Sequence, residues 1–437
     1  MLQKIVAVKP EEVRALALGF LYYFLILSSY YVIRPIRDDF GVAGGLENLA
    51  TMFTGTLLVM LIANALFSSL AARLSRRRFI PIAYRFFIVN LLIFFMLLHF
   101  VPKQQIWVGR AFFIWTSVFN LFVISVFWAF MVDCFTVQQG KRLFGFISVG
   151  GTLGAIVGAA ITATLVSKLG TLNLLLIAAV LVELSAQCVR FFPAPPKEST
   201  SREPAQNQEA PVGGSVWAGL IHNLKSPYLL GISAYMLLYS ITSTLLYFQQ
   251  AGIAKNAFVD RAARTAFFAQ IDLVVNTMTI LIQVFVTGKL LKWLGVGVTL
   301  AILPALSVIG FTTVGLKPTL VILVFFLVLR RAANFAIARP ARETLFTVVD
   351  REDKYKSKNF IDTIVYRTGD QIGAWTSTAL DNLALGLREV SFAAAPIAVV
   401  WLLVSLWLGK KQQQVISEDA VQSPKSNVQS PMSATVD

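Results

Sequence analysis

The chain has 437 residues, of which 56% are hydrophobic and 14% are charged, and its formal net charge is +15. Soluble domains carry about a quarter charged residues, so this composition excludes an ordinary soluble protein and predicts a chain that lies in a lipid bilayer. The two cysteines and two histidines fit no metal-ligand motif. The sequence therefore excludes a disulfide framework and predicts no metal and no cofactor.

Apolar segments of about 20 residues, the length that a bilayer requires of a helix, recur along the chain. They are continuous rather than alternating, which argues against a β-barrel. The first is too long for a signal peptide and lacks a small-residue cleavage site, so it is predicted to be a retained membrane helix. The twelve predicted helices span residues 15–36, 49–70, 79–100, 106–132, 143–166, 171–192, 227–248, 264–287, 295–316, 318–338, 360–381 and 391–409.

These helices form two sets of six, separated by a stretch rich in Pro, Ser, Gln and charge that is typical of a flexible linker. About 25 of the Lys and Arg residues fall on the side that holds both termini and this stretch, and about 10 on the other, so the positive-inside rule makes the first side cytoplasmic. The predicted divisions are an N-terminal bundle (1–192), a cytoplasmic linker (193–226), a C-terminal bundle (227–411) and a disordered cytoplasmic tail (412–437).

Six helices, a linker and six further helices resemble the plan of the major facilitator superfamily, whose halves are repeats around a midplane substrate site. A faint repeat is visible: residues 133–144 and 350–361 each lie between the fourth and fifth predicted helices of a half, and a glycine-rich stretch follows each of them. The predicted fold class is an all-α membrane protein with twelve transmembrane helices in two six-helix pseudo-repeats.

The first predicted helix runs into the charged stretch SSYYVIRPIRDDFGVAGG. Arg34 and Asp38 are four residues apart and Arg34 and Arg37 three, so on a continuing helix they share a face. Pro35 lacks an N–H and is expected to kink or end the helix. Two interpretations stay open: the charges reach the outer interface, or Arg37 binds an anion at the mouth of a central cavity while Asp38 fixes its geometry.

A second basic cluster, LRRAANFAIARPARETLF, ends the tenth predicted helix. An arginine inside a membrane needs a partner or a substrate, and its planar group donates two parallel hydrogen bonds to phosphate or carboxylate. Arg331 and Arg342 are therefore candidates for anion binding and Glu343 for orienting them. Alternatively, the arginines contact lipid phosphates, or pair with Glu343 and Asp350.

Two features surround the loop after the fourth predicted helix. Asp133 is predicted to form a gate or loop ion pair with Lys141 or Arg142. Further on, GGTLGAIVG places small residues every four positions on one helix face, which lets membrane helices approach closely. In a transporter whose halves rock against each other, we expect that contact to lie where they move. The candidate gating or coupling residues are Arg34, Asp133, Lys141, Arg142, Asp350, Asp362 and Asp370.

These stretches resemble one family, the ATP:ADP antiporters (nucleotide transporters) of intracellular bacteria and plastids. YYVIRPIRDDFGV is similar to its first-helix signature, with Arg37–Asp38 in place of Lys-Asp, and QQGKRLFG to its Glu-Ala-Lys-Arg-aromatic loop. Gln139 and Arg339 replace acids of the family, which leaves more positive charge and favours an anionic solute. The third stretch matches its order at Arg331, Pro340, Arg342, Glu343, Asp350, Lys358 and Asp362.

The resemblance and the residues together predict a secondary transporter that works by alternating access and exchanges or carries an anionic, nucleotide-like or phosphorylated solute. We expect a monomer in the bacterial inner membrane, with no nucleic acid partner and no enzymatic activity. Two alternatives stay open. The first is a proton-coupled exporter of a metabolite, siderophore or drug, with Asp272 or Asp370 as the titrating group. The second is a non-transporting receptor or assembly partner, whose centre holds no converging arginines.

Overall fold

The structure is a computed structural model, and it describes residues 8–73, 76–193, 226–349, 357–358 and 360–422. These residues are helical and contain no strand. The first half holds six long helices: α2 (Val13–Ala43), α3 (Leu49–Arg73), α4 (Arg76–Phe100), α5 (Gln105–Cys134), α6 (Val137–Leu169) and α7 (Leu174–Arg190).

The second half begins with α9 (Pro227–Ala257) and α10 (Arg261–Ile282). A π-helical turn, η5 (Gln283–Thr287), leads from α10 into α11 (Gly288–Leu316). The remaining elements are α12 (Leu320–Ala333), η6 (Asn334–Ala338), α13 (Arg339–Leu345), η8 (Ile361–Val365), α15 (Tyr366–Asn382) and α16 (Leu387–Gln422). Two further π-helical turns, η6 and η8, lie beside charged residues, and π-helical turns are frequent at functional sites.

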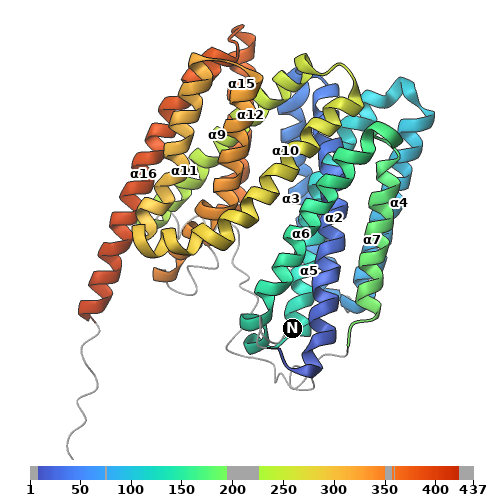
Figure 1. The fold of residues 1–437 in the computed structure, drawn as a ribbon, viewed down its shortest axis with the longest axis horizontal. Coiled ribbons are helices and arrows are strands. Elements are labelled where there is room, and N and C mark those ends of the chain that lie inside the picture. The colour runs from blue at the N-terminus through green and yellow to red at the C-terminus, as the bar shows by residue number, and fades with distance from the viewer. Residues whose placement is uncertain (1–7, 74–75, 194–225, 350–356, 359, 423–437) are drawn as a thin grey trace, which may run out of the picture.

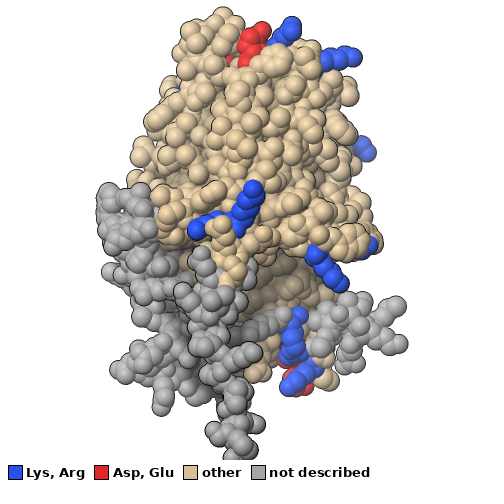
Figure 2. All heavy atoms as spheres, turned by 90° about the vertical axis from the view of Figure 1, so that its left-hand side faces the viewer, with Lys and Arg blue, Asp and Glu red and all other residues tan. Residues whose placement is uncertain are grey.

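Among the described residues, nine stretches are long and apolar enough to cross a membrane. One of them, Arg261–Leu316, holds both α10 and α11, while α7 and α15 are not among the nine. The all-α membrane fold is thus confirmed, and the number of twelve spans stays a prediction. Figure 2 shows a broad uncharged band on the α11 and α16 side. Most Lys and Arg in this view lie above the band, at the top of the molecule, or below it.

The helices form two groups (Figure 1). We call the side on which α2 and α9 begin, at the bottom of Figure 1, the lower side, and the side on which they end the upper side. The groups meet on the upper side and diverge toward the lower one. Contacts between them join α6 to α10 and α3 to α15. In each case the fifth long helix of one half meets the second of the other, as a twofold pseudo-repeat requires.

Three predicted helix ends are wrong. Pro35 does not end the first helix, which continues to Ala43. The tenth predicted helix does not stop at residue 338, because η6 and α13 extend it to Leu345. Residues 412–422, predicted to be disordered, belong to α16, and the Gln412 amide donates to the Thr344 carbonyl (2.9 Å). These helices continue through charged and polar residues because residues of other helices pair with those polar groups.

The glycine-rich stretches pack helices within each half rather than between halves. A Cβ at Gly154 would overlap the Phe24 carbonyl of α2, and one at Gly158 would overlap that of Ser28. On α15, a Cβ at Gly373 would lie 2.9 Å from the Ile241 carbonyl oxygen of α9. The expectation that the α6 glycines lie where the halves move is therefore wrong, although both halves use the same device.

Candidate functional site

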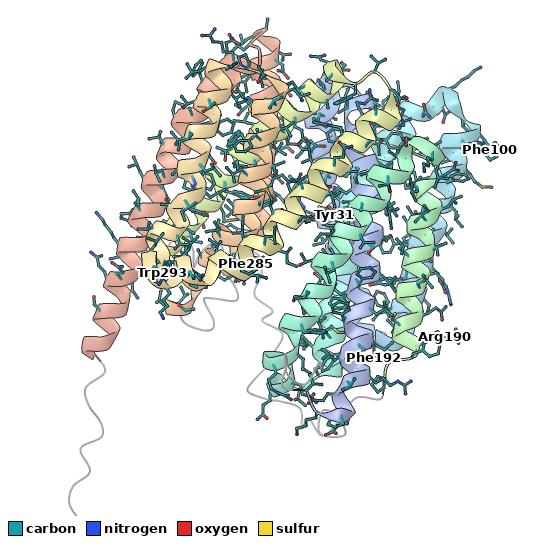
Figure 3. The ribbon with its side chains drawn as sticks, in the orientation of Figure 1. Tyr31, Phe100, Arg190, Phe192, Phe285 and Trp293 are labelled. Carbon is teal, nitrogen blue, oxygen red and sulfur yellow. The ribbon has the colours of Figure 1, made fainter. Side chains whose placement is uncertain are left out.

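A cavity of about 470 Å³ lies between the two halves. Tyr31 of α2 is one of its lining residues and lies between the two groups of helices in Figure 3. Two carboxylates, of Asp38 and Asp370, are among its described lining residues, and Asp272 lies behind two of the arginines. The lining arginines are Arg34, Arg37, Arg330, Arg331, Arg339 and Arg367.

Formal charge in this cavity is positive. Six arginines and three aspartates leave a balance of +3. Aromatic rings from both halves also line the cavity, and most of them carry a hydroxyl. These rings belong to Tyr23, Tyr30, Tyr31, Phe53, Tyr239, Tyr247, Phe335 and Tyr366. A positive chamber walled by rings and hydroxyls suits an anion that also has a flat or polar part.

One carboxylate of the second half binds an arginine from each half. Arg34 Nη1 of α2 lies 2.8 Å from Asp272 Oδ1 of α10, and Arg331 Nη2 of α12 lies 2.6 Å from the same oxygen. Asp272 is 1% exposed, and its Oδ2 accepts no hydrogen bond from a described residue. Both predicted arginines therefore line the cavity, but each engages a carboxylate there.

Arg37 and Asp38 lie in the same cavity, as the second interpretation of this stretch expects. Arg37 Nη1 is 3.1 Å from Asp38 Oδ1, and its guanidinium carbon lies 3.9 Å from the centre of the Phe113 ring. The Tyr247 hydroxyl of the other half donates to Asp38 Oδ1 (3.0 Å). Asp38 thus fixes Arg37 within the first half and also contacts the second half.

Arg330, the neighbour of Arg331 in the second basic cluster, is not among the residues that the sequence predicts for anion binding. It is 3% exposed, and its partners are neutral: Nε donates to Ser307, Nη1 to Ser243 and Nη2 to Thr242, at 3.0, 3.0 and 2.8 Å. The rings of Tyr239 and Trp401 lie 5.5 and 5.7 Å from its guanidinium carbon. No described carboxylate forms an ion pair with it. Neighbouring positions on a helix point in different directions, so sequence could not rank Arg330 above Arg331.

The lower part of the site holds the remaining predicted pair. Arg342 Nη2 lies 3.3 Å from Asp362 Oδ1 and 3.6 Å from Glu343 Oε1. Glu343 also pairs with Lys358, and 45% of its side chain is exposed. Arg342 and Asp362 therefore line a second, smaller chamber below the cavity, while Glu343 lies at the surface near that chamber.

Asp370 of α15 is buried at the cavity wall. Its Oδ1 accepts hydrogen bonds from Ser240 (2.6 Å) and Thr244 (3.2 Å) of α9, and its Oδ2 lies 3.1 Å from Arg367 Nη1. Arg367 and Asp370 are three residues apart, a spacing that places them on one face of α15. The hydroxyl partners came from another helix and were not predicted.

The gate or loop ion pair that the sequence predicts after the fourth helix lies only partly within the residues that the structure describes. Arg142 lies 2.8 Å from Glu12 Oε1, and Gln139 donates to the same oxygen (3.0 Å). Asp133 lies exposed near the end of α5. Lys141 belongs to α6, and its side chain, like the whole of Asp350, lies outside the described residues. Glu12, which was not predicted, is thus the described carboxylate that holds this corner.

An ion-pair cluster on the upper side was missed. Asp39 of α2 is fully buried, and its two oxygens lie 2.9 Å from Arg261 Nε and 2.7 Å from Arg264 Nε of α10. Apolar residues of both halves, among them Val42 and Leu245, pack together on this side. Asp39 follows Asp38 directly, but no spacing rule relates it to residues of α10 that are more than 200 positions away.

Comparisons with known proteins agree with this architecture. Residues 15–349 match the Major Facilitator Superfamily. The chain is 21% identical over 354 residues to ADP,ATP carrier protein 1 of Chlamydia muridarum (strain MoPn / Nigg), which covers 72% of this chain and 67% of the carrier.

Two solved structures are similar in fold. A D-xylose-proton symporter has a TM-score of 0.62 and 13% identity, covering 90% of this chain and 96% of the symporter. The nucleoside transporter NupG has a TM-score of 0.56 and 12% identity, covering 93% of this chain and 99% of NupG. The apolar helices, the charged cavity between two halves and the match over most of the chain lead to one conclusion: this multi-pass membrane protein belongs to the Major Facilitator Superfamily and is a secondary transporter of that type.

Proposed function

We propose that the protein exchanges an anionic, nucleotide-like or phosphorylated solute across a bacterial inner membrane. The observation that carries the proposal is the buried Arg330, a cation with hydroxyl partners and no described carboxylate, in a cavity of net positive charge. A charge buried without an opposite charge is costly, and an anionic solute would supply that opposite charge. In this proposal Arg330 binds an anionic group, as do Arg37, Arg331 and Arg342. Asp38 and Glu343 orient these arginines.

The solute class follows from the other walls of the cavity. Tyrosine rings such as Tyr31 and Tyr239 offer flat surfaces and hydroxyls beside the arginines. This combination suits a molecule with an aromatic ring at one end and phosphate at the other. The similarity to a protein named an ADP,ATP carrier supports the same class.

The transport cycle would use the contacts between the halves. With the termini in the cytoplasm, the upper side is the outer one and is sealed by Asp39 with Arg261 and Arg264. A bound anion would compete with Asp272 for Arg34 and Arg331, which releases a tie between the halves. Without a solute the arginines repel each other, so the occupied carrier returns faster than the empty one. Such a carrier exchanges one solute for another instead of returning empty.

The test is a solute screen followed by exchange measurements. Purified protein is heated with nucleotides, sugar phosphates and organic acids, because a ligand of the folded protein raises its Tm. A solute that raises Tm is then loaded into proteoliposomes, and uptake of its labelled form is measured. We expect uptake to require solute inside. Equal uptake into empty vesicles contradicts exchange, and a Tm response to neutral sugars alone contradicts the anionic class.

A second candidate is proton-coupled transport. Asp370, buried against Ser240 and Thr244 in the cavity wall, is the observation that favours it. This candidate predicts that collapsing the proton gradient stops solute flux and that Asp370→Asn does the same. Exchange of the anionic solute predicts flux that continues without a proton gradient. The receptor alternative expected no converging arginines, and this cavity differs from that expectation.

A further inference from the structure

The cavity continues toward the lower side as a second chamber of about 380 Å³. The two spaces share walls, among them Asn120, Tyr239 and Arg339. Tyr235 of α9 and Arg342 of α13 line the lower chamber but not the cavity. A solute in the lower chamber therefore lies beside these two side chains.

Two buried hydrogen-bond donors in this chamber have no described partner. The Tyr235 hydroxyl is one of them, although that residue is only 2% exposed. Arg342 Nε is the other, while the Nη2 atom of the same side chain lies 3.3 Å from Asp362. Buried polar groups almost always have a hydrogen-bond partner, so a ligand is the simplest reason to keep two such donors beside one cavity.

The chamber also has the charge and the acceptor that a ligand would need. Arg339, Arg342 and Arg367 line it, against Asp362 and the Asp370 that holds Arg367, which leaves one positive charge. Asn120 Oδ1, on α5 of the opposite half, is buried without a described donor. An anionic group near Arg342 and an N–H or O–H group near Asn120 would satisfy both walls.

We propose that the lower chamber is a second binding station, in which Tyr235 and Arg342 hold an anionic group of the transported solute. The inference rests on the proposed function, because it assigns the same solute to both places. Arg331 and Arg342 are eleven positions apart along one helical stretch, which is about 16.5 Å at the rise of a helix. Their guanidinium groups lie at different carboxylates, Asp272 and Asp362, so the stations fill separately or with the two ends of a longer solute.

The experiment is equilibrium dialysis of full-length purified protein with radiolabelled pyrophosphate. Wild type is expected to bind it at two classes of site. Tyr235→Phe removes one hydroxyl without changing shape, and Arg342→Lys keeps a positive charge beside Asp362 but lacks Nε. Each is expected to weaken one class by about tenfold, as the loss of a hydrogen bond to a charged group does. Arg330→Met is expected to weaken the other class.

Tyr228→Phe is the matched control on the same helix. Its hydroxyl donates to the Leu345 carbonyl (2.8 Å) and lines neither chamber, so binding should stay as in wild type while Tm falls. A single class of site that Tyr235→Phe and Arg342→Lys leave unchanged overturns the second station and keeps the proposed function. Absence of any pyrophosphate binding by wild type overturns both.

Discussion

At the scale of single residues, Arg330 and Asp272 differ in how their buried charges are compensated. Arg330 is a buried cation that hydroxyls and ring faces stabilise, whereas Asp272 is a buried anion between two cations. Hydroxyls satisfy the hydrogen bonds of a guanidinium but do not neutralise its charge. The local field around Arg330 is therefore positive, and it attracts any anion that enters the cavity.

Arg330→Met should weaken anion binding without unfolding the protein. Methionine fills a similar volume, and it removes a buried charge that has no described carboxylate partner and is therefore costly to bury. Loss of charged hydrogen bonds to a ligand costs about 1.5–3 kcal/mol each, so affinity should fall at least about tenfold. Thermal shift and dialysis with the solute from the screen measure both effects. Arg190→Gln, at the right-hand edge of the first half in Figure 3 and far from the second half, is the control. Unchanged affinity of Arg330→Met contradicts the proposed site.

Asp272→Asn should make the protein less stable and more dependent on its solute. The neutral amide leaves Arg34 and Arg331 without their buried carboxylate, and breaking a buried pair costs about 3–5 kcal/mol. An added anion can then take the place of the lost charge. We expect a lower Tm without solute and a larger rise of Tm with solute than in wild type. A solute response equal to or smaller than that of wild type is the contrary result.

At the scale of helices, close approach of backbones organises each half. The glycine face of α6 lies against α2, and the glycines of α15 lie against α9. In lipid, helix association depends on such packing rather than on the hydrophobic effect. Because α2 and α9 carry residues of the cavity wall, this packing also sets the positions of Arg34 and Asp38 in the first half and of Tyr239 in the second.

Gly154→Ala should therefore lower Tm, and Gly145→Ala should not. Alanine favours a helix over glycine by about 0.5–1 kcal/mol, so both changes help α6 itself. At Gly154 the new methyl group overlaps the Phe24 carbonyl, and overpacking costs about 1–3 kcal/mol. At Gly145 no atom lies within 4 Å. Thermal unfolding in one detergent compares the pair, and equal Tm values for the two variants would show that the contact is loose.

At the scale of the whole molecule, polar and apolar contacts close the upper side. Asp39 is the centre of the polar part, since it binds two arginines of α10 and has no exposed surface. In the proposed transport cycle this cluster has to break when the halves rock. The energy of the cluster would then set how often the upper side opens.

Asp39→Asn should shift the protein toward the conformation that is open on the upper side. Gln250 lines the cavity and is 6% exposed, so Gln250→Cys reports this opening through its reaction with an impermeant maleimide. We expect labelling from the upper side to be about tenfold faster in Asp39→Asn, as for a loss of 1.4 kcal/mol. Asp260→Asn, an exposed cap that asparagine replaces well, is the control. Equal labelling rates would remove Asp39 from the gate.

Composition and segment length determined most of the architecture, because a bilayer demands long apolar helices and allows few charges within them. The sequence also offered Arg37, Arg331 and Arg342 as candidates for anion binding and Arg34 and Asp370 as candidates for gating or coupling, since buried charge in a membrane is costly. Tertiary structure alone decided that the buried Arg330 has no carboxylate partner among the described residues, that Asp39 binds two arginines on the upper side, and that Tyr235 and Arg342 share a chamber. These contacts join residues on different helices, and the rotation and approach of those helices depend on packing over the whole fold, which no local spacing encodes.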